Sequence, residues 1–249
     1  MFKRNKKQVE HYKTPTGTIY SLYKNMLQQS HLLVAGATGS GKSVIVNSLI
    51  HTALFDSPVK VGFILIDPKK VELDDYQYLP HTITYSDQTK THTQALNYAM
   101  NIVDNRHAYM KPRGIKTYDG SDIYVIIDEL ADLMTTNRHE VQPIIQRLCQ
   151  IGRSARVHVI ACTQCPISKI LPTEIKVNFD SRVALRTACK QDSRNIIGIT
   201  GCENFPDPVT ENKAYAYYKH GCHMDLYNVP RYDKAEQKRI IEYWLNYPA

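Results

Sequence analysis

The sequence predicts an α/β fold in which a mostly parallel sheet carries helices on both faces, and two observations support this prediction. The first is a set of short apolar runs with almost no charge, which are typical of buried strands. The second is that segments with helical spacing of apolar residues separate most of these runs. Strands that alternate with helices form parallel sheets covered on both faces. The predicted strands lie at 31–35, 61–67, 123–127, 157–161 and 182–185.

Helices are expected where apolar side chains recur every three or four residues. The first follows the first strand and repeats Ile45, Leu49 and Ala53. Pro68 ends the second strand, so the next residues form a loop or a short helix. The remaining predicted helices lie at 91–110, 141–151 and 234–246.

The C-terminal part and the N-terminal tail complete the expected organisation. Residues 213–218 and 222–229 flank a His-Gly pair, which indicates a hairpin at the edge of the sheet, and the last helix follows. Residues 1–13 form a basic tail, and 14–249 are expected to be a single domain because no internal linker or repeat interrupts them.

Composition places limits on location and partners. The 249 residues carry 31 Lys and Arg against 24 Asp and Glu, a net charge of +7. This surplus is compatible with a polyanionic partner, although many soluble enzymes have a similar charge. No apolar run approaches the ~20 residues that span a bilayer, and no apolar segment follows the basic N-terminus. We therefore expect a cytoplasmic protein.

The six cysteines do not predict a metal or redox site. In a cytoplasmic chain they are expected to stay reduced. Cys162 and Cys165 form a Cys-x-x-Cys motif, but the chain has no second closely spaced pair for zinc. Cys162 also ends a predicted strand, whereas a redox motif usually opens a helix.

A phosphate-binding loop lies between the first strand and the first predicted helix. Residues 36–43 match G-x-x-x-x-G-K-[ST], and the strand and helix on either side are the context that this motif requires. Its glycines allow a tight turn whose N–H groups face a phosphate, and the helix N-terminus adds partial positive charge. Lys42 and the hydroxyl of Ser43 suit ATP phosphates and Mg²⁺. The predicted nucleotide-binding residues are Gly36, Ala37, Thr38, Gly39, Ser40, Gly41, Lys42 and Ser43.

Polar residues follow two further strands at the edge where α/β proteins bind ligands. Asp128 ends the third predicted strand and suits the Mg²⁺ shell, and Glu129 suits the role of general base toward water. Gln164 follows the fourth strand. It is either a ligand of the γ-phosphate or the attacking water, or simply a polar strand end.

These segments together resemble the FtsK/SpoIIIE DNA translocase motor. The similarity runs from about residue 16 to 201 in order and spacing. The stretches at 66–69 and 125–134 make it specific, because a generic phosphate-binding loop protein lacks both. The matching segments are 31–43, 66–69 (Ile-Asp-Pro-Lys), 125–134 (Val-Ile-Ile-Asp-Glu-Leu-Ala-Asp-Leu-Met) and 161–164 (Ala-Cys-Thr-Gln).

The resemblance implies a RecA-like P-loop NTPase that assembles as a hexameric ring, threads double-stranded DNA and hydrolyses ATP with Mg²⁺ between subunits. The pattern Arg-Leu-x-Gln-x-x-Arg at 147–153 makes Arg153 the candidate arginine that acts on the neighbour's ATP. From the residues alone, an arginine after a helix is more often solvated. The basic residues of the family's channel loops fall on Lys176, Lys190 and Arg194.

The sequence departs from the family pattern at several places. Cys165 stands where the family usually has Arg, which removes one basic contact. The family's membrane-anchoring and winged-helix regions are not recognised, and the pattern fades beyond residue 201. We therefore expect a bare motor of the kind that mobile elements, plasmids or phages encode.

Three functions compete at this point. The leading one is an ATP-driven translocase of double-stranded DNA. The second is an ATPase subunit of a secretion or conjugative coupling complex, which shares the same motor ancestry. The third is an assembly module that binds nucleotide with little turnover, and Glu129 argues against it.

Overall fold

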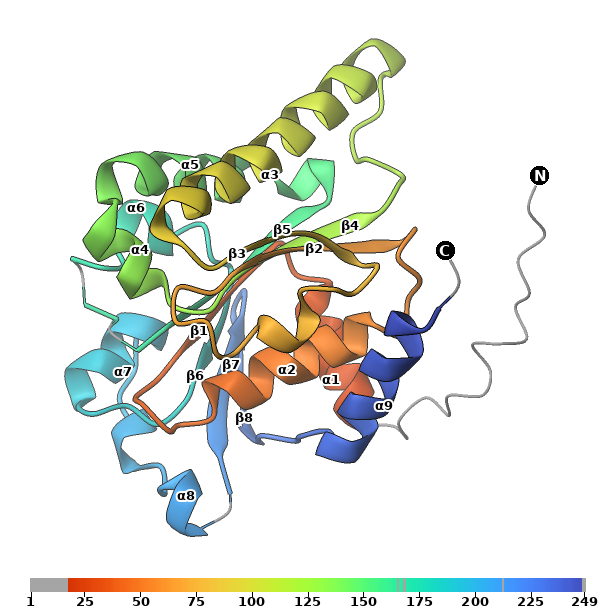
Figure 1. The fold of residues 1–249 in the computed structure, drawn as a ribbon. Coiled ribbons are helices and arrows are strands. Elements are labelled where there is room, and N and C mark those ends of the chain that lie inside the picture. The colour runs from red at the N-terminus through yellow and green to blue at the C-terminus, as the bar shows by residue number, and fades with distance from the viewer. Residues whose placement is uncertain (1–17, 165, 168, 212, 248–249) are drawn as a thin grey trace.

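The computed structural model describes residues 18–247 apart from 165, 168 and 212 (Figure 1). The predicted tail at 1–13 and the departure at Cys165 lie outside the described residues. Within them, eight strands form one sheet in the order β3-β2-β4-β5-β1-β6-β7-β8. The strands are β1 (His31–Ala35), β2 (Val61–Ile66), β3 (Thr82–Ser86), β4 (Asp122–Ile127), β5 (Val157–Thr163), β6 (Ser181–Ala184), β7 (Tyr215–His220) and β8 (His223–Asn228).

The sheet is parallel from β3 to β6 and antiparallel beyond it. Strands β1 and β5 pair in parallel, as do β2 and β4, so their carboxyl ends meet at one edge. Strands β6 and β7, and then β7 and β8, pair antiparallel. The predicted fold class, an α/β protein with a mostly parallel sheet and helices on both faces, is confirmed.

Helices cover the two faces of the sheet as two layers (Figure 1). Alternate side chains of a strand point to opposite faces, so Leu33 and Ala35 pack with α3, α4 and α5, whereas Leu32 and Val34 pack with α1, α2 and α9. The helices are α1 (Thr18–Leu27), α2 (Lys42–Ala53), α3 (Thr89–Met110), α4 (Leu130–Thr136), α5 (Arg138–Ile151), α6 (Thr173–Lys176), α7 (Lys190–Ile197), α8 (Pro208–Glu211) and α9 (Lys234–Leu245).

Helix α9 closes the second layer over α1 and α2. The indole N–H of Trp244 donates to the carbonyl of Leu54 over 2.8 Å, and the Tyr23 hydroxyl donates to the carbonyl of Pro230. These bonds attach the C-terminal segment to α1 and to the end of α2, the helix that follows the phosphate-binding loop. Among the described residues, no helix is both long and apolar enough to span a membrane.

A buried histidine beneath this segment predicts a loss of stability in acid. His51 of α2 is 1% exposed, packs against Tyr232 with ring centroids 4.1 Å apart and ring planes tilted by 39°, and has no hydrogen-bond partner among the described residues. Burial lowers its pKa to about 4. The unfolded chain, with an ordinary histidine pKa, therefore binds more protons than the folded one between about pH 6.5 and pH 4, and stability falls as the pH drops through this window.

We therefore expect His51→Phe to resist acid better than the unchanged protein. Because the buried His51 stays neutral, it lowers the free energy of unfolding by about 2 kcal/mol at pH 5 and by almost nothing at pH 7. Urea unfolding at both pH values measures it: the drop in unfolding free energy from pH 7 to pH 5 should shrink by about that amount in the variant. An equal drop in both proteins would show that His51 is not a source of acid sensitivity.

Candidate active site

The phosphate-binding loop, residues 36–43, connects β1 to the N-terminus of α2. Gly41 adopts a φ of +103°, a backbone conformation that residues with a side chain rarely adopt. A Cβ on Gly36 would lie 2.6 Å from Ser40 Oγ and 2.8 Å from Leu185 Cβ, so only glycine fits there. These two positions therefore shape the loop into a phosphate-binding cradle, which is lined by backbone N–H groups and the N-terminus of α2.

Lys42 and Ser43 occupy the first turn of α2. The ammonium of Lys42 donates to the carbonyl oxygens of Gly36 and Ala37 over 2.8 and 2.9 Å, within its own loop. Burial lowers its pKa, because a desolvated ammonium lacks the hydration that stabilises its charge. A phosphate group supplies the negative partner that such an ammonium prefers, so the loop fits a nucleotide.

Three carboxylates lie at the carboxyl ends of the neighbouring strands β2 and β4. Asp67 follows β2, and Asp128 and Glu129 follow β4; the Asp128 N–H donates to Ile66 O over 3.0 Å. Burial raises the pKa of Asp128 to about 7, and the negative charges of Asp67 and Glu72 add to the shift. A divalent cation relieves such crowding of negative charge. The three carboxylates do not converge as a metal-binding cluster among the described residues, so Asp128 alone of them suits the Mg²⁺ shell, together with the Ser43 hydroxyl.

Glu129 and Gln164 are connected to the phosphate-binding loop by hydrogen bonds. The Gln164 backbone N–H donates to Glu129 Oε1 over 3.1 Å, and the Thr38 hydroxyl donates to Gln164 Oε1 over 2.7 Å. The other Glu129 oxygen, Oε2, lies 3.1 Å from Lys69 Nζ. The structure thus brings the two predicted residues after β4 and β5 together with the loop, and adds Lys69 to them.

Sequence reasoning gave no role to Asp67 and Lys69, although it noted the motif that contains them. The Asp67 side chain is fully buried and accepts hydrogen bonds from the backbone N–H groups of Lys69, Val71, Glu72 and Leu73. It therefore fixes the loop that carries Lys69. The available signal was a carboxylate followed by proline directly after a buried strand.

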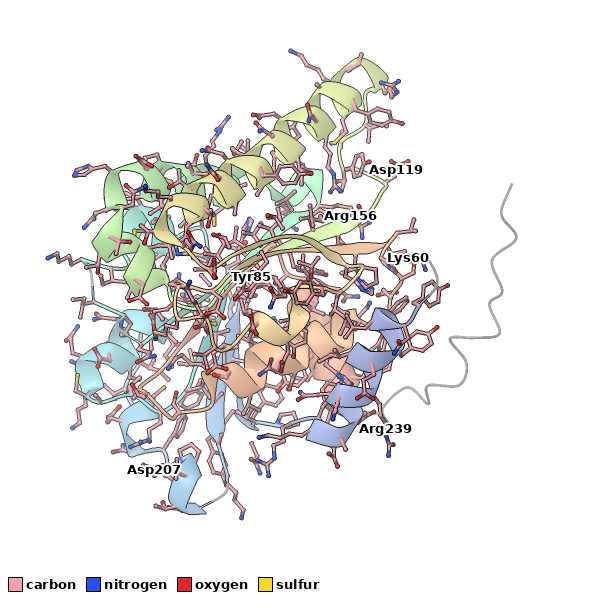
Figure 2. The ribbon with its side chains drawn as sticks, viewed as in Figure 1. Lys60, Tyr85, Asp119, Arg156, Asp207 and Arg239 are labelled. Carbon is pink, nitrogen blue, oxygen red and sulfur yellow. The ribbon has the colours of Figure 1, made fainter. Side chains whose placement is uncertain are left out.

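Arg153 lies at the opposite edge of the sheet. It is exposed, in a short 3₁₀ turn (Arg153–Ala155) that precedes β5, whereas Gln164 follows β5. The seven residues of β5 separate the two edges by roughly 20 Å. Figure 2 shows Lys60, Asp119 and Arg156 around the same amino edge, with Asp207 at the other end of the molecule. Arg153 therefore cannot reach the phosphate-binding loop of its own chain.

A cavity of about 680 Å³ opens at this amino edge and has Arg153 in its wall. Lys24 and Arg156 pair there with Asp56 and Asp122. Among the described residues, the exposed Arg153 side chain makes no hydrogen bond or ion pair, so its guanidinium is available to a group outside its own chain.

The three candidate DNA-contact residues fall on two helices. Lys190 and Arg194 are exposed and lie one turn apart on α7, so they share a face. Lys176 is half-buried at the end of α6. The start of α7 adjoins the phosphate-binding loop: Asp192 and Gln164 line a cavity of about 250 Å³ together with Gly36, Ala37, Thr38, Pro166, Thr187 and Ala188.

Comparison with known protein families matches residues 14–123 and 120–169 to the FtsK/SpoIIIE family. Among curated proteins, the DNA translocase FtsK of Caldanaerobacter subterraneus is 38% identical over 192 residues, covering 72% of this chain and 27% of the relative. FtsK of Chlorobaculum tepidum is 39% identical over 195 residues, covering 70% of this chain and 24% of the relative. The chain thus spans about a quarter of the length of these relatives.

Solved structures share the fold at lower sequence identity. The pCW3 conjugation coupling protein TcpA, in its monomer form with ATPγS, matches with a TM-score of 0.75 and 22% identity over 87% of this chain and 65% of its own. The cytoplasmic domain of the Thermomonospora curvata type VII secretion ATPase EccC matches with a TM-score of 0.72 and 16% identity over 89% of this chain and 28% of its own.

Proposed function

Since this chain belongs to the FtsK/SpoIIIE family and has the fold of P-loop ATPases, as its sequence predicts, we propose that it is an ATP-driven motor that moves double-stranded DNA. The single observation that carries the proposal is the hydrogen-bonded arrangement of Glu129, Gln164 and Thr38 at the phosphate-binding loop. A carboxylate and an amide beside the phosphate-binding loop support the hydrolysis of ATP, because they are groups that can activate and orient an attacking water.

Each residue of the site has a distinct role in this proposal. The backbone of residues 36–41 and Lys42 hold the phosphates, and Ser43 and Asp128 hold Mg²⁺, which neutralises negative charge on the phosphate oxygens. Glu129 accepts the proton of the attacking water. Gln164 orients that water or the γ-phosphate, because its side chain already contacts Thr38 of the loop.

Assembly into a ring explains the position of Arg153. In a ring of identical subunits, each contact joins two different surfaces, and we propose that these are the amino edge of one subunit and the nucleotide edge of the next. Arg153 then supplies the positive charge that phosphoryl transfer requires in its transition state. We propose a homo-oligomeric ring, six-membered as the family resemblance implies, with Lys176, Lys190 and Arg194 toward the DNA.

The ATPase rate with and without double-stranded DNA tests this function. Strong stimulation by DNA of unrelated sequences is expected, because a motor must engage any sequence that passes through it. An ATPase rate that does not respond to DNA would contradict DNA translocation. It would favour the alternative, a motor of a secretion or conjugative coupling complex. A cytoplasmic location, like an origin in a mobile element, stays a prediction.

Replacing Lys190 and Arg194 by Ala, together with Lys176, is expected to weaken DNA binding without loss of basal ATPase. These side chains would contact phosphates and not bases, so binding should tolerate sequence and weaken steeply with salt. Each lost phosphate contact should reduce the log–log salt slope by about 0.9. Titration of labelled duplex DNA at several salt concentrations measures the slope.

The control for this triple variant is Lys111→Ala together with Arg113→Ala, two exposed basic residues beyond α3. They lie on the turn that ends α3, away from α6 and α7, so their removal should leave the slope unchanged. An unchanged slope in the triple variant would contradict the assignment of these three residues to DNA.

A further inference from the structure

Both carboxylate oxygens of Glu129 are engaged by neighbouring groups. Lys69 Nζ lies 3.1 Å from Oε2, and the Gln164 N–H donates to Oε1 over 3.1 Å. The Glu129 side chain is 4% exposed and that of Lys69 is 39% exposed, so the pair lies at the margin of the site. An ammonium that donates to a carboxylate oxygen fixes the orientation of the carboxylate and occupies that oxygen, which is then not free to accept a proton from water.

The loop that carries Lys69 is rigid, whereas its side chain is not. The four backbone hydrogen bonds to Asp67 hold residues 69–73, and Pro68 fixes the chain between them. Lys70 next to it adopts a φ of +58°, which completes a tight turn. The four-carbon stem of a lysine is flexible. Lys69 is therefore able to leave Glu129 by rotating its side chain, without movement of the loop.

We infer that Lys69 restrains Glu129 in a conformation that does not activate water, and that hydrolysis requires the Lys69 ammonium to leave this carboxylate. The inference rests on the proposed role of Glu129 as the base. Lys69 is then a positioning residue, since it acts through Glu129 and not on the substrate.

The second hydrogen bond of Glu129 leads toward the proposed DNA-contact helix. Gln164 accepts from Thr38 and lines the same cavity as Asp192 of α7, which carries Lys190 and Arg194. Glu129 is thus held on one oxygen by Lys69 and on the other by a residue that lines the cavity next to α7.

The test is Lys69→Met, which keeps a flexible unbranched side chain of nearly the same length and removes its charge. The ATPase rate constant without DNA should rise about fivefold, the rate equivalent of an ion pair with this exposure. The KM for ATP should stay unchanged, and stimulation by DNA should fall because the basal rate has risen. Lys69→Arg, which restores a cation, should return the basal rate toward that of the unchanged protein.

The matched control is Lys70→Met. Lys70 is the next residue, and its ammonium pairs with Asp87 over 3.0 Å and not with Glu129. Its removal should leave the basal rate unchanged. Comparison of the two variants therefore distinguishes the effect of losing a surface charge in this loop from the effect of losing the contact with Glu129.

A basal rate in Lys69→Met that equals or falls below that of the unchanged protein would overturn the inference, provided that its unfolding temperature and ATP affinity are unchanged. If Lys69→Met is unstable, Lys69→Gln is judged by the same criterion. Glu129→Gln is measured alongside: near-normal hydrolysis in that variant refutes the proposed base itself, whereas an inactive Glu129→Gln with no acceleration in Lys69→Met refutes the restraint alone.

Discussion

Glu129→Gln is expected to bind ATP with normal affinity and to hydrolyse it about 10²–10⁴-fold more slowly, which is the usual contribution of a general base. Glutamine has the shape of glutamate, and its amide oxygen still accepts a hydrogen bond from the Gln164 N–H. Glutamine, however, has no basic carboxylate that could accept a proton from water. Binding of a fluorescent ATP analogue and steady-state ATPase measurements separate the two steps.

Two variants give this experiment its controls. Lys42→Ala should lose ATP binding itself, because the phosphates lose their main positive partner. Asp132→Asn alters another carboxylate, in the first turn of α4, and should keep most of the activity, since the hydrogen bonds that join Thr38, Gln164 and Glu129 do not include its side chain. Near-normal turnover by Glu129→Gln would contradict the assignment of the base.

The central strands could be predicted from sequence because both faces of the sheet are covered. Residues of β2 and β5 are buried along their whole length, so the strands appear as continuous apolar runs. Strand β3 was missed: it lies at the edge of the sheet, and only Ser86 among its five residues is buried. Its sequence, Thr-Ile-Thr-Tyr-Ser, is not a continuous apolar run, and its alternation of polar and apolar residues covers only five positions.

Short helices were missed for a related reason. Helices α4 and α7 have seven and eight residues, which is about two turns, and a repeat of that length cannot be distinguished from chance. Both are buried on one side by the sheet and by neighbouring helices, so tertiary packing and not local propensity stabilises them.

In the candidate site too, local sequence motifs could be predicted, whereas contacts between distant residues could not. The phosphate-binding loop and the Asp128–Glu129 pair are local patterns whose meaning is contained in a few consecutive residues. The contacts of Glu129 with Lys69 and of Thr38 with Gln164 join residues that are 60 and 126 positions apart. Only the parallel pairing of β2 with β4, and of β1 with β5, brings these strand ends together.

Arg153→Ala is expected to bind ATP normally and to hydrolyse it about 10³–10⁵-fold more slowly, which is the contribution of an arginine that stabilises the transition state of phosphoryl transfer. The geometry requires this arginine to act on a neighbour, because it lies at the amino edge of the sheet, roughly 20 Å from the phosphate-binding loop of its own chain. Arg147→Ala, an exposed arginine of α5, is the matched control and should keep its activity.

A mixture of Arg153→Ala and Glu129→Gln subunits decides whether the arginine acts between subunits. Each variant is inactive alone, because every interface lacks one of the two groups. In a random equal mixture, about a quarter of the interfaces of a ring join an intact Glu129 to an intact Arg153 of the neighbour. Activity should therefore reappear on mixing. If mixed assemblies form, as shown by co-purification of two differently tagged variants, and no activity returns, Arg153 does not act on the ATP of the neighbouring subunit.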